Sequence, residues 1–260
     1  MQDERKSAGE AMSGKYLKSS IDILRLLIVI GILILIVAFV VMDNSQPLFL
    51  SSSIAIALLA LVNYLALHRE GNSEWKTYAL LLFFAMVCGT IGDFLMAGII
   101  YITPEPLING ILLFGIGHVF YLMGLRNRSP LLLRKRDSGG TKLIARNLII
   151  WIVCVVIVLA IFYFTVFNSA MLILSIGALG YGILLVTVLA FAITKWASKF
   201  SLPLRIALVL GFFLFLFSDW LIAYHEFTDP AFLSGAYVGI TYAIGQLLIQ
   251  LTPFLGSRAS

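Results

Sequence analysis

Charged residues are scarce in this chain of 260 residues, at 12% of the total, whereas hydrophobic residues make up 61%. A water-soluble domain cannot bury so large an apolar fraction, so the composition excludes the soluble protein classes. The alternating stretches of about ten residues that form transmembrane barrels are also absent. What remains is a protein of membrane-spanning helices.

Cysteine and histidine are rarer still, with two and three residues. The two cysteines, Cys88 and Cys154, lie within apolar segments, which argues against a disulfide framework. The chain has three histidines, and they form no His/Cys cluster, so no metal-ligand pattern is present. We expect no metal, no cofactor and no nucleic-acid partner.

Long charge-free stretches dominate what is present. Windows of about 18 or more uncharged residues are long enough to cross the hydrocarbon core of a bilayer as helices. They predict an all-α polytopic membrane protein, a bundle of about eight transmembrane helices. We expect one membrane domain over 21–252, with flexible cytoplasmic tails at 1–20 and 253–260. The predicted spans are 21–42, 47–67, 77–99, 107–124, 144–166, 169–192, 204–224 and 233–252.

The loop charges predict an orientation. The segments 43–46, 100–106, 167–168 and 225–232 contain no Lys or Arg, whereas the tails and the other loops contain most of them. Under the positive-inside rule, both termini are cytoplasmic. The basic loop from Arg126 to Lys142 either fixes this topology or also binds anionic lipid headgroups. We expect a multi-pass protein of the plasma (inner) membrane of a prokaryote.

Ionisable side chains at membrane depth are costly and mark functional sites. Asp93, in Gly89-Thr-Ile-Gly92-Asp93, and Asp219, in Ser218-Asp219-Trp220, both fall within predicted spans. Each lies five or six residues before the outer end of its predicted helix, so the two carboxyl groups have similar depth. They can meet if their helices are neighbours.

Polar side chains on two further spans complete the candidate site. His118 and Tyr121 share one helix face, and Tyr242 and Gln246 share another. Each Asp is followed on the next span by His or Gln, after 25 and 27 residues, which suggests a parallel repeat of four helices each. His118 and Gln246 can equally be packing residues with ordinary interhelical hydrogen bonds.

Four motifs in order along 25–252 carry a resemblance to a known family. They are Gly92-Asp93-x-x-Met96, Gly117-His118-x-x-Tyr121, Ser218-Asp219-x-Leu221-Ile-Ala223 and Tyr242-x-x-x-Gln246. The chain resembles the YhhN family, which includes the mammalian transmembrane-86 lysoplasmalogenases.

The resemblance implies hydrolysis of the vinyl ether bond of lysoplasmalogens, with lysophospholipid and membrane lipids as partners. Asp93 and Asp219 would be the catalytic residues, one as a protonated acid and one as a carboxylate, by analogy with glycosidases. His118, Tyr121, Ser218, Tyr242 and Gln246 would bind the substrate or orient water.

Two other classes share the feature of paired membrane aspartates. An intramembrane aspartyl protease would carry the motifs Gly-x-Gly-Asp and Pro-Ala-Leu. In this chain two residues separate the glycines, in Gly89-Thr-Ile-Gly92-Asp93, and no Pro-Ala-Leu occurs. A proton-coupled transporter or a lipid-binding protein without hydrolase activity fits the carboxylates equally well. No Gly/Pro-broken pair of spans of the kind that forms ion sites is present, which counts against a transporter.

Overall fold

The computed structural model describes residues 2–127, 139–197, 200–228 and 235–259. Over these residues it contains eight long helices, all apolar enough to span a membrane, and no strand. The chain is therefore a multi-pass integral membrane protein, and the predicted eight-helix fold is confirmed. The helices are α1 Gln2–Val41, α2 Gln46–Arg69, α3 Ser73–Met96, α4 Pro106–Asn127, α5 Gly139–Thr165, α6 Leu172–Thr194, α7 Leu202–Phe227 and α8 Gly235–Ala259.

Both chain ends continue the helices into segments that we predicted as tails. α1 begins at Gln2, although its membrane-spanning part is Ser19–Val41, and α8 reaches Ala259. Residues 2–18 contain no proline, and about half of them are Ala, Glu, Lys or Arg, which favour a helix, so an existing helix can extend through them despite Gly9 and Gly14. The basic segment expected as a lipid site lies partly outside the described residues, at 128–138.

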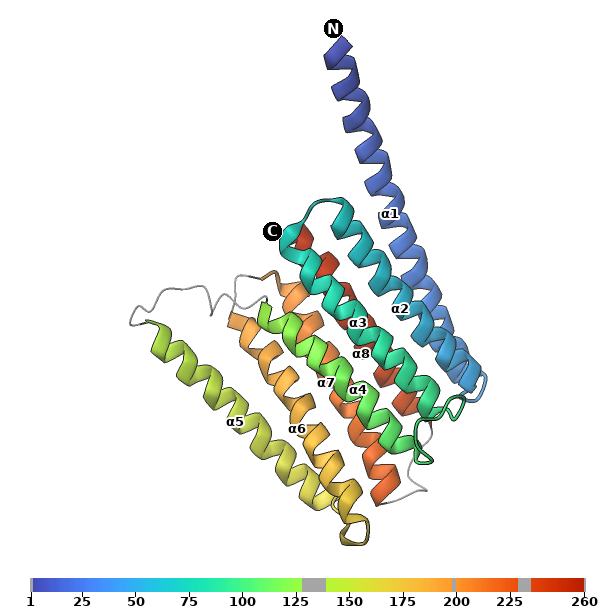
Figure 1. Ribbon diagram of the computed structural model, residues 1–260, viewed down its shortest axis with the longest axis vertical. Helices are drawn as coiled ribbons and strands as arrows, with labels where there is room; N and C mark the ends of the chain where they lie inside the picture. The colour runs from blue at the N-terminus through green and yellow to red at the C-terminus, as the bar shows by residue number, and fades with distance from the viewer. Residues whose placement is uncertain (1, 128–138, 198–199, 229–234, 260) are drawn as a thin grey trace.

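The helices form two similar halves, α1–α4 and α5–α8. Within each half the consecutive helices pack against one another, and α2 packs on α8 as α6 packs on α4. This pattern fits the predicted parallel repeat of four helices. Figure 1 shows α1 and α5 at opposite edges of the bundle and both chain ends at the same end of it. Which end faces the cytoplasm stays a prediction from the loop charges.

The two halves differ in one respect that matters for the site. α8, from the second half, packs against both α1 and α3 of the first half. By the symmetry of the repeat, α4 of the first half should pack against α5 and α7 of the second. Within the described residues neither of these pairs packs to a comparable extent. The space between α4, α5 and α7 is therefore more open than the related space between α8, α1 and α3.

A tightly packed core lies at the end of the bundle that holds the termini. Its members include Tyr121 and Leu125 near the end of α4, Leu189 near the end of α6, and Leu208 and Phe212 in the first half of α7. All are buried. The helices of the second half thus diverge only towards the opposite end.

Two glycines set the closest approach between α7 and α8. A Cβ atom on Gly211 would lie 2.8 Å from Ile249 Cγ1, and one on Gly245 would lie 2.9 Å from the Gly211 carbonyl oxygen. Small residues at such crossings allow membrane helices to approach closely. Because Gly245 faces backbone atoms, the neighbouring helix has no flexible side chain that could make room.

We expect Gly245→Val to destabilise the folded protein by about 1–3 kcal/mol, since it overpacks this crossing. The measurement is thermal unfolding in detergent together with the yield of monodisperse protein. Gly180→Val is the matched control, because a Cβ atom on Gly180 meets nothing within 4 Å. Equal stability of the two variants would contradict the close packing of α7 on α8.

Candidate active site

Asp93 is buried near the end of α3 that lies away from the termini. Its Oδ2 atom accepts a hydrogen bond from the Ser53 hydroxyl of α2 and another, at 2.8 Å, from the Tyr242 hydroxyl of α8. Gly92 beside it lets the Phe114 ring approach, since a Cβ there would lie 3.0 Å from that ring. Asp93 is therefore held at a three-helix junction.

Asp219 lies on α7 in the other half of the repeat. It accepts a hydrogen bond from the Tyr181 hydroxyl of α6, as Asp93 does from Ser53 of the related helix α2. Neither aspartate has an ion-pair partner among the described residues. Asp93 is buried and Asp219 is half-buried. Carboxyl groups at membrane depth without cationic partners are unusual and fit a functional site.

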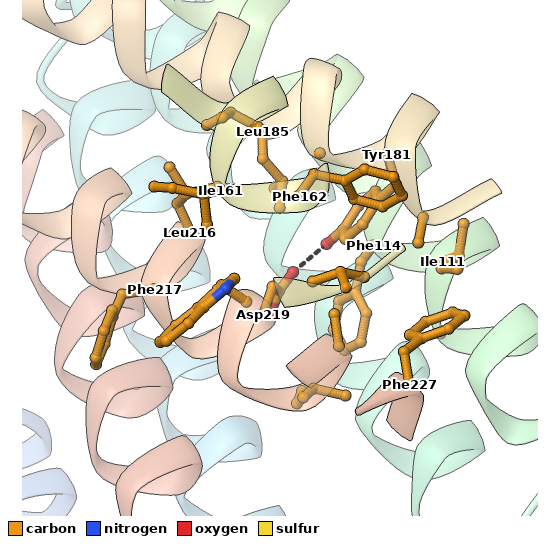
Figure 2. Close-up of a pocket in the computed structure, with 18 of the residues that line it drawn as sticks. Ile111, Phe114, Ile161, Phe162, Tyr181, Leu185, Leu216, Phe217, Asp219 and Phe227 are labelled. Carbon is orange, nitrogen blue, oxygen red and sulfur yellow. Dashed lines mark hydrogen bonds between the residues drawn. The ribbon is translucent and has the colours of Figure 1, made fainter. Parts of the chain in front are cut away.

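A cavity of about 490 Å³ opens beside Asp219, a volume within the usual range for small-molecule sites. It lies between positions 107–114 of α4, 158–166 at the end of α5, 178–185 of α6 and 213–227 of α7, with Met96 of α3. This is the region where α4, α5 and α7 diverge. Figure 2 shows Asp219 and Tyr181 joined across it, surrounded by apolar side chains.

The polar groups on the cavity wall are few. Asp219 provides the only carboxyl group among the lining residues, and Thr165 the only aliphatic hydroxyl. That hydroxyl already donates to the Ile161 carbonyl and accepts from Trp220 Nε1. The wall thus presents one acid in an apolar space.

The two aspartates lie in different halves of the bundle, and each forms its hydrogen bonds with other side chains. α3 packs mainly against α2, α4 and α8, whereas α7 packs mainly against α6 and α8, so α3 and α7 do not pack extensively against each other. A layer of aromatic rings lies between the two sites. The Phe215 ring centroid lies 5.4 Å from that of Tyr242 and 6.3 Å from that of Phe114, which lines the cavity.

His118 lies buried in this aromatic layer. Its ring centroid is 4.5 Å from that of Phe215 and 5.9 Å from that of Tyr181. Nδ1 is 2.8 Å from the Phe114 carbonyl oxygen, and a carbonyl can only accept, so Nδ1 carries the proton. Nε2 has no hydrogen-bond partner among the described residues.

Other predicted binding residues lie away from the cavity wall. Tyr121 donates to Gln246 Oε1 at 2.6 Å and accepts from Gln250 Nε2 at 2.9 Å, which links α4 to α8. Ser218 donates to the Val238 carbonyl at 3.3 Å, which links α7 to α8. Of the predicted site residues, the structure places only Asp219 on the cavity wall, with Tyr242 and His118 in the layer behind it.

Sequence reasoning missed Tyr181, Ser53 and Phe114. Tyr181 stands between Gly180 and Gly182, and Ser53 ends a run of three serines inside an apolar span. Polar groups within spans were a usable signal for the tyrosine and the serine. Phe114 has no such signal, because its role depends on which helices it lies between.

Comparison with known proteins adds the decisive observation. The family model described as "YhhN family" matches residues 46–252. The chain belongs to the YhhN family. The match covers α2 to most of α8, and so includes all seven predicted site residues of this YhhN protein. No curated protein and no solved structure matches it.

Proposed function

We propose that this YhhN protein hydrolyses the vinyl ether bond of lysoplasmalogen-type lysophospholipids and releases a fatty aldehyde. The observation that carries the proposal is a single carboxyl group on the wall of an otherwise apolar cavity. An apolar cavity suits the fatty chain of a single-chain lipid. The vinyl ether bond lies at the head of that chain, where a carboxyl group beside the chain can reach it.

The composition of the wall favours this bond over an ester. Ester hydrolysis by a protein nucleophile needs an activated serine or cysteine with an adjacent base. The lining residues include neither, and the Thr165 hydroxyl is engaged with Ile161 and Trp220. Vinyl ether hydrolysis needs only a proton donor and water.

In the first step, Asp219 transfers its proton to the second carbon of the alkenyl chain. The alkene electron pair forms the new C–H bond, and the first carbon becomes part of an oxocarbenium ion. The Tyr181 hydroxyl bonds one oxygen of Asp219 and stabilises the carboxylate as the proton leaves. The ring of Phe114, on the cavity wall, can stabilise the cation through its face.

In the second step, water adds to the cationic carbon and its proton passes to the Asp219 carboxylate. The resulting hemiacetal breaks its bond to the glycerol oxygen, giving aldehyde and alcohol. Asp93 lies behind the aromatic layer and, as a carboxylate, would stabilise the cation electrostatically without touching it. Vinyl ether and water are the only reactants consumed.

The test compares three lysophospholipids with the same chain, joined to glycerol by a vinyl ether, an alkyl ether or an ester bond. Purified protein should release aldehyde from the vinyl ether and leave the other two intact, as measured by mass spectrometry. Release of fatty acid from the ester would contradict the proposal. Saturable uptake of the vinyl ether lipid into proteoliposomes without aldehyde would instead indicate a transporter.

Tyr181→Phe removes only the hydroxyl that bonds Asp219. We expect kcat to fall about 10- to 100-fold with little change in KM, since a hydrogen bond to a charged group contributes ~1.5–3 kcal/mol. Tyr163→Phe is the matched control, because Tyr163 lies on α5 and is exposed. An unchanged kcat in Tyr181→Phe would remove Tyr181 from the mechanism.

A further inference from the structure

The cavity lies mostly in the half of the bundle opposite the chain termini. On α4 it uses the first half of the helix, and on α5 the last residues. On α7 it begins at Phe213 and reaches Phe227, the last residue of the helix. On all three helices most of the lining residues therefore lie on the same side of the bundle midplane.

The packed core closes the cavity from the side of the termini. Tyr121, Leu189 and Phe212 belong to one buried cluster that joins α4, α6 and α7 between the cavity and the end of the bundle that holds the termini. These side chains fill the interior between the cavity and the ends of the helices. A lipid cannot reach Asp219 from that side without separating the three helices.

The cavity has an opening towards the surrounding membrane between α5 and α7. Three of its lining side chains, one on α5 and two on α7, are exposed, and this indicates that the cavity is open between these helices: Ile161 at 42%, Phe213 at 49% and Phe217 at 38%. Figure 2 shows Ile161 and Phe217 on the same side of the pocket. We call the opening bordered by these three residues the lateral window.

Hydrogen bonds close the space between the lateral window and the end of the bundle away from the termini. Trp220 Nε1 donates to Thr165 Oγ1 at 3.0 Å, and the Thr228 hydroxyl donates to the Thr165 carbonyl. These bonds join α7 to the end of α5, on the side away from the termini. In addition, no residue of α5 between 144 and 165 is buried, so this helix presents apolar side chains to lipid along its length.

We propose that the lipid enters the cavity sideways, through the lateral window, from the bilayer leaflet opposite the chain termini. This inference rests on the proposed function for the identity of the lipid but not for the route. With the predicted orientation, the leaflet is the non-cytoplasmic one. A chain that slides in between α5 and α7 brings its head end beside Asp219 without leaving the membrane.

The test uses a lysophosphatidylcholine whose chain carries a photoactivatable diazirine. Full-length protein is reconstituted with no more than a single molecule in most vesicles, and beads that bind the C-terminal tag from outside retain only the vesicles in which the termini face outward. The probe is placed either in the outer leaflet alone or in both leaflets, and cross-linked residues are mapped by mass spectrometry. We expect adducts on the lateral window and cavity residues only when the probe is in both leaflets.

Two variants on α5 make the test specific. Ile161→Trp should narrow the lateral window and lose the adducts in the cavity, whereas Ile157→Trp should retain them. Ile157 is exposed one turn away and does not line the cavity. Cavity adducts from the outer leaflet alone, or undiminished adducts in Ile161→Trp, would overturn the proposed route. Adducts as expected without aldehyde release in detergent would uphold the route and contradict the proposed function.

Discussion

Asp219→Asn should lower the rate of aldehyde release by about 10²- to 10⁴-fold, the usual contribution of a general acid. Asparagine has nearly the same size and still offers an oxygen to the Tyr181 hydroxyl, so the hydrogen bond between α6 and α7 can persist. What it lacks is the acidic proton that the first step transfers to the alkenyl chain. Aldehyde measured under saturating lysoplasmalogen gives the effect on kcat.

The matched control for this variant is Glu226→Gln. Glu226 lies on the same helix, is exposed and does not line the cavity, so the same chemical change there should leave the turnover unchanged. Thermal unfolding of both variants in detergent separates a catalytic effect from a folding defect. Turnover of the Asp219→Asn protein close to that of the unmodified protein would refute Asp219 as the acid.

Asp93→Asn should lower kcat by about 10²- to 10³-fold, the effect of removing one group that stabilises transition-state charge. The amide oxygen can still accept hydrogen bonds from Ser53 and Tyr242, so the three-helix junction should remain intact. The reason for the loss is electrostatic, because Asp93 lies behind the aromatic layer and does not line the cavity. Asp43→Asn, in the exposed turn after α1, is its control.

The double variant, with both aspartates replaced by asparagine, shows whether the two carboxyl groups act together or independently. If both carboxyl groups serve one transition state, Asp93→Asn combined with Asp219→Asn should be little worse than Asp219→Asn alone. If Asp93 serves only the packing of α2, α3 and α8, its substitution should lower the unfolding temperature and leave kcat unchanged. That outcome would assign Asp93 a structural role and leave Asp219 as the single catalytic carboxyl group.

The fold was largely predictable because the membrane itself sets the length and composition of a span. Eight long apolar stretches with few charges correspond to eight helices in the described part of the chain. The ends of the chain were not predictable on this basis, since α1 continues to Gln2 through residues that favour a helix without needing a membrane. Hydrophobic length indicates where a span lies but not where its helix begins.

The site was predictable only in part, for a related reason. Asp93 and Asp219 stood out because a carboxyl group is costly at membrane depth. Tyr181 and Ser53 carry no charge, so the free-energy cost of placing them in the membrane does not distinguish them from other polar residues in spans. Whether the two aspartates lie close together could not be predicted, because hydropathy does not specify which helices are neighbours. The cavity arises from a difference in packing between two similar halves, which no pattern within a single span records.

The most direct test of the proposed chemistry follows the solvent atoms into the products. Purified protein would hydrolyse a lysoplasmalogen in D₂O and, separately, in water labelled with ¹⁸O, with the aldehyde trapped as it forms and analysed by mass spectrometry. Protonation of the alkene predicts one deuterium on the second carbon of the aldehyde and no ¹⁸O in the released glycerol product. An aldehyde without deuterium, ¹⁸O in the glycerol hydroxyl, or no aldehyde at all would contradict vinyl ether hydrolysis at Asp219.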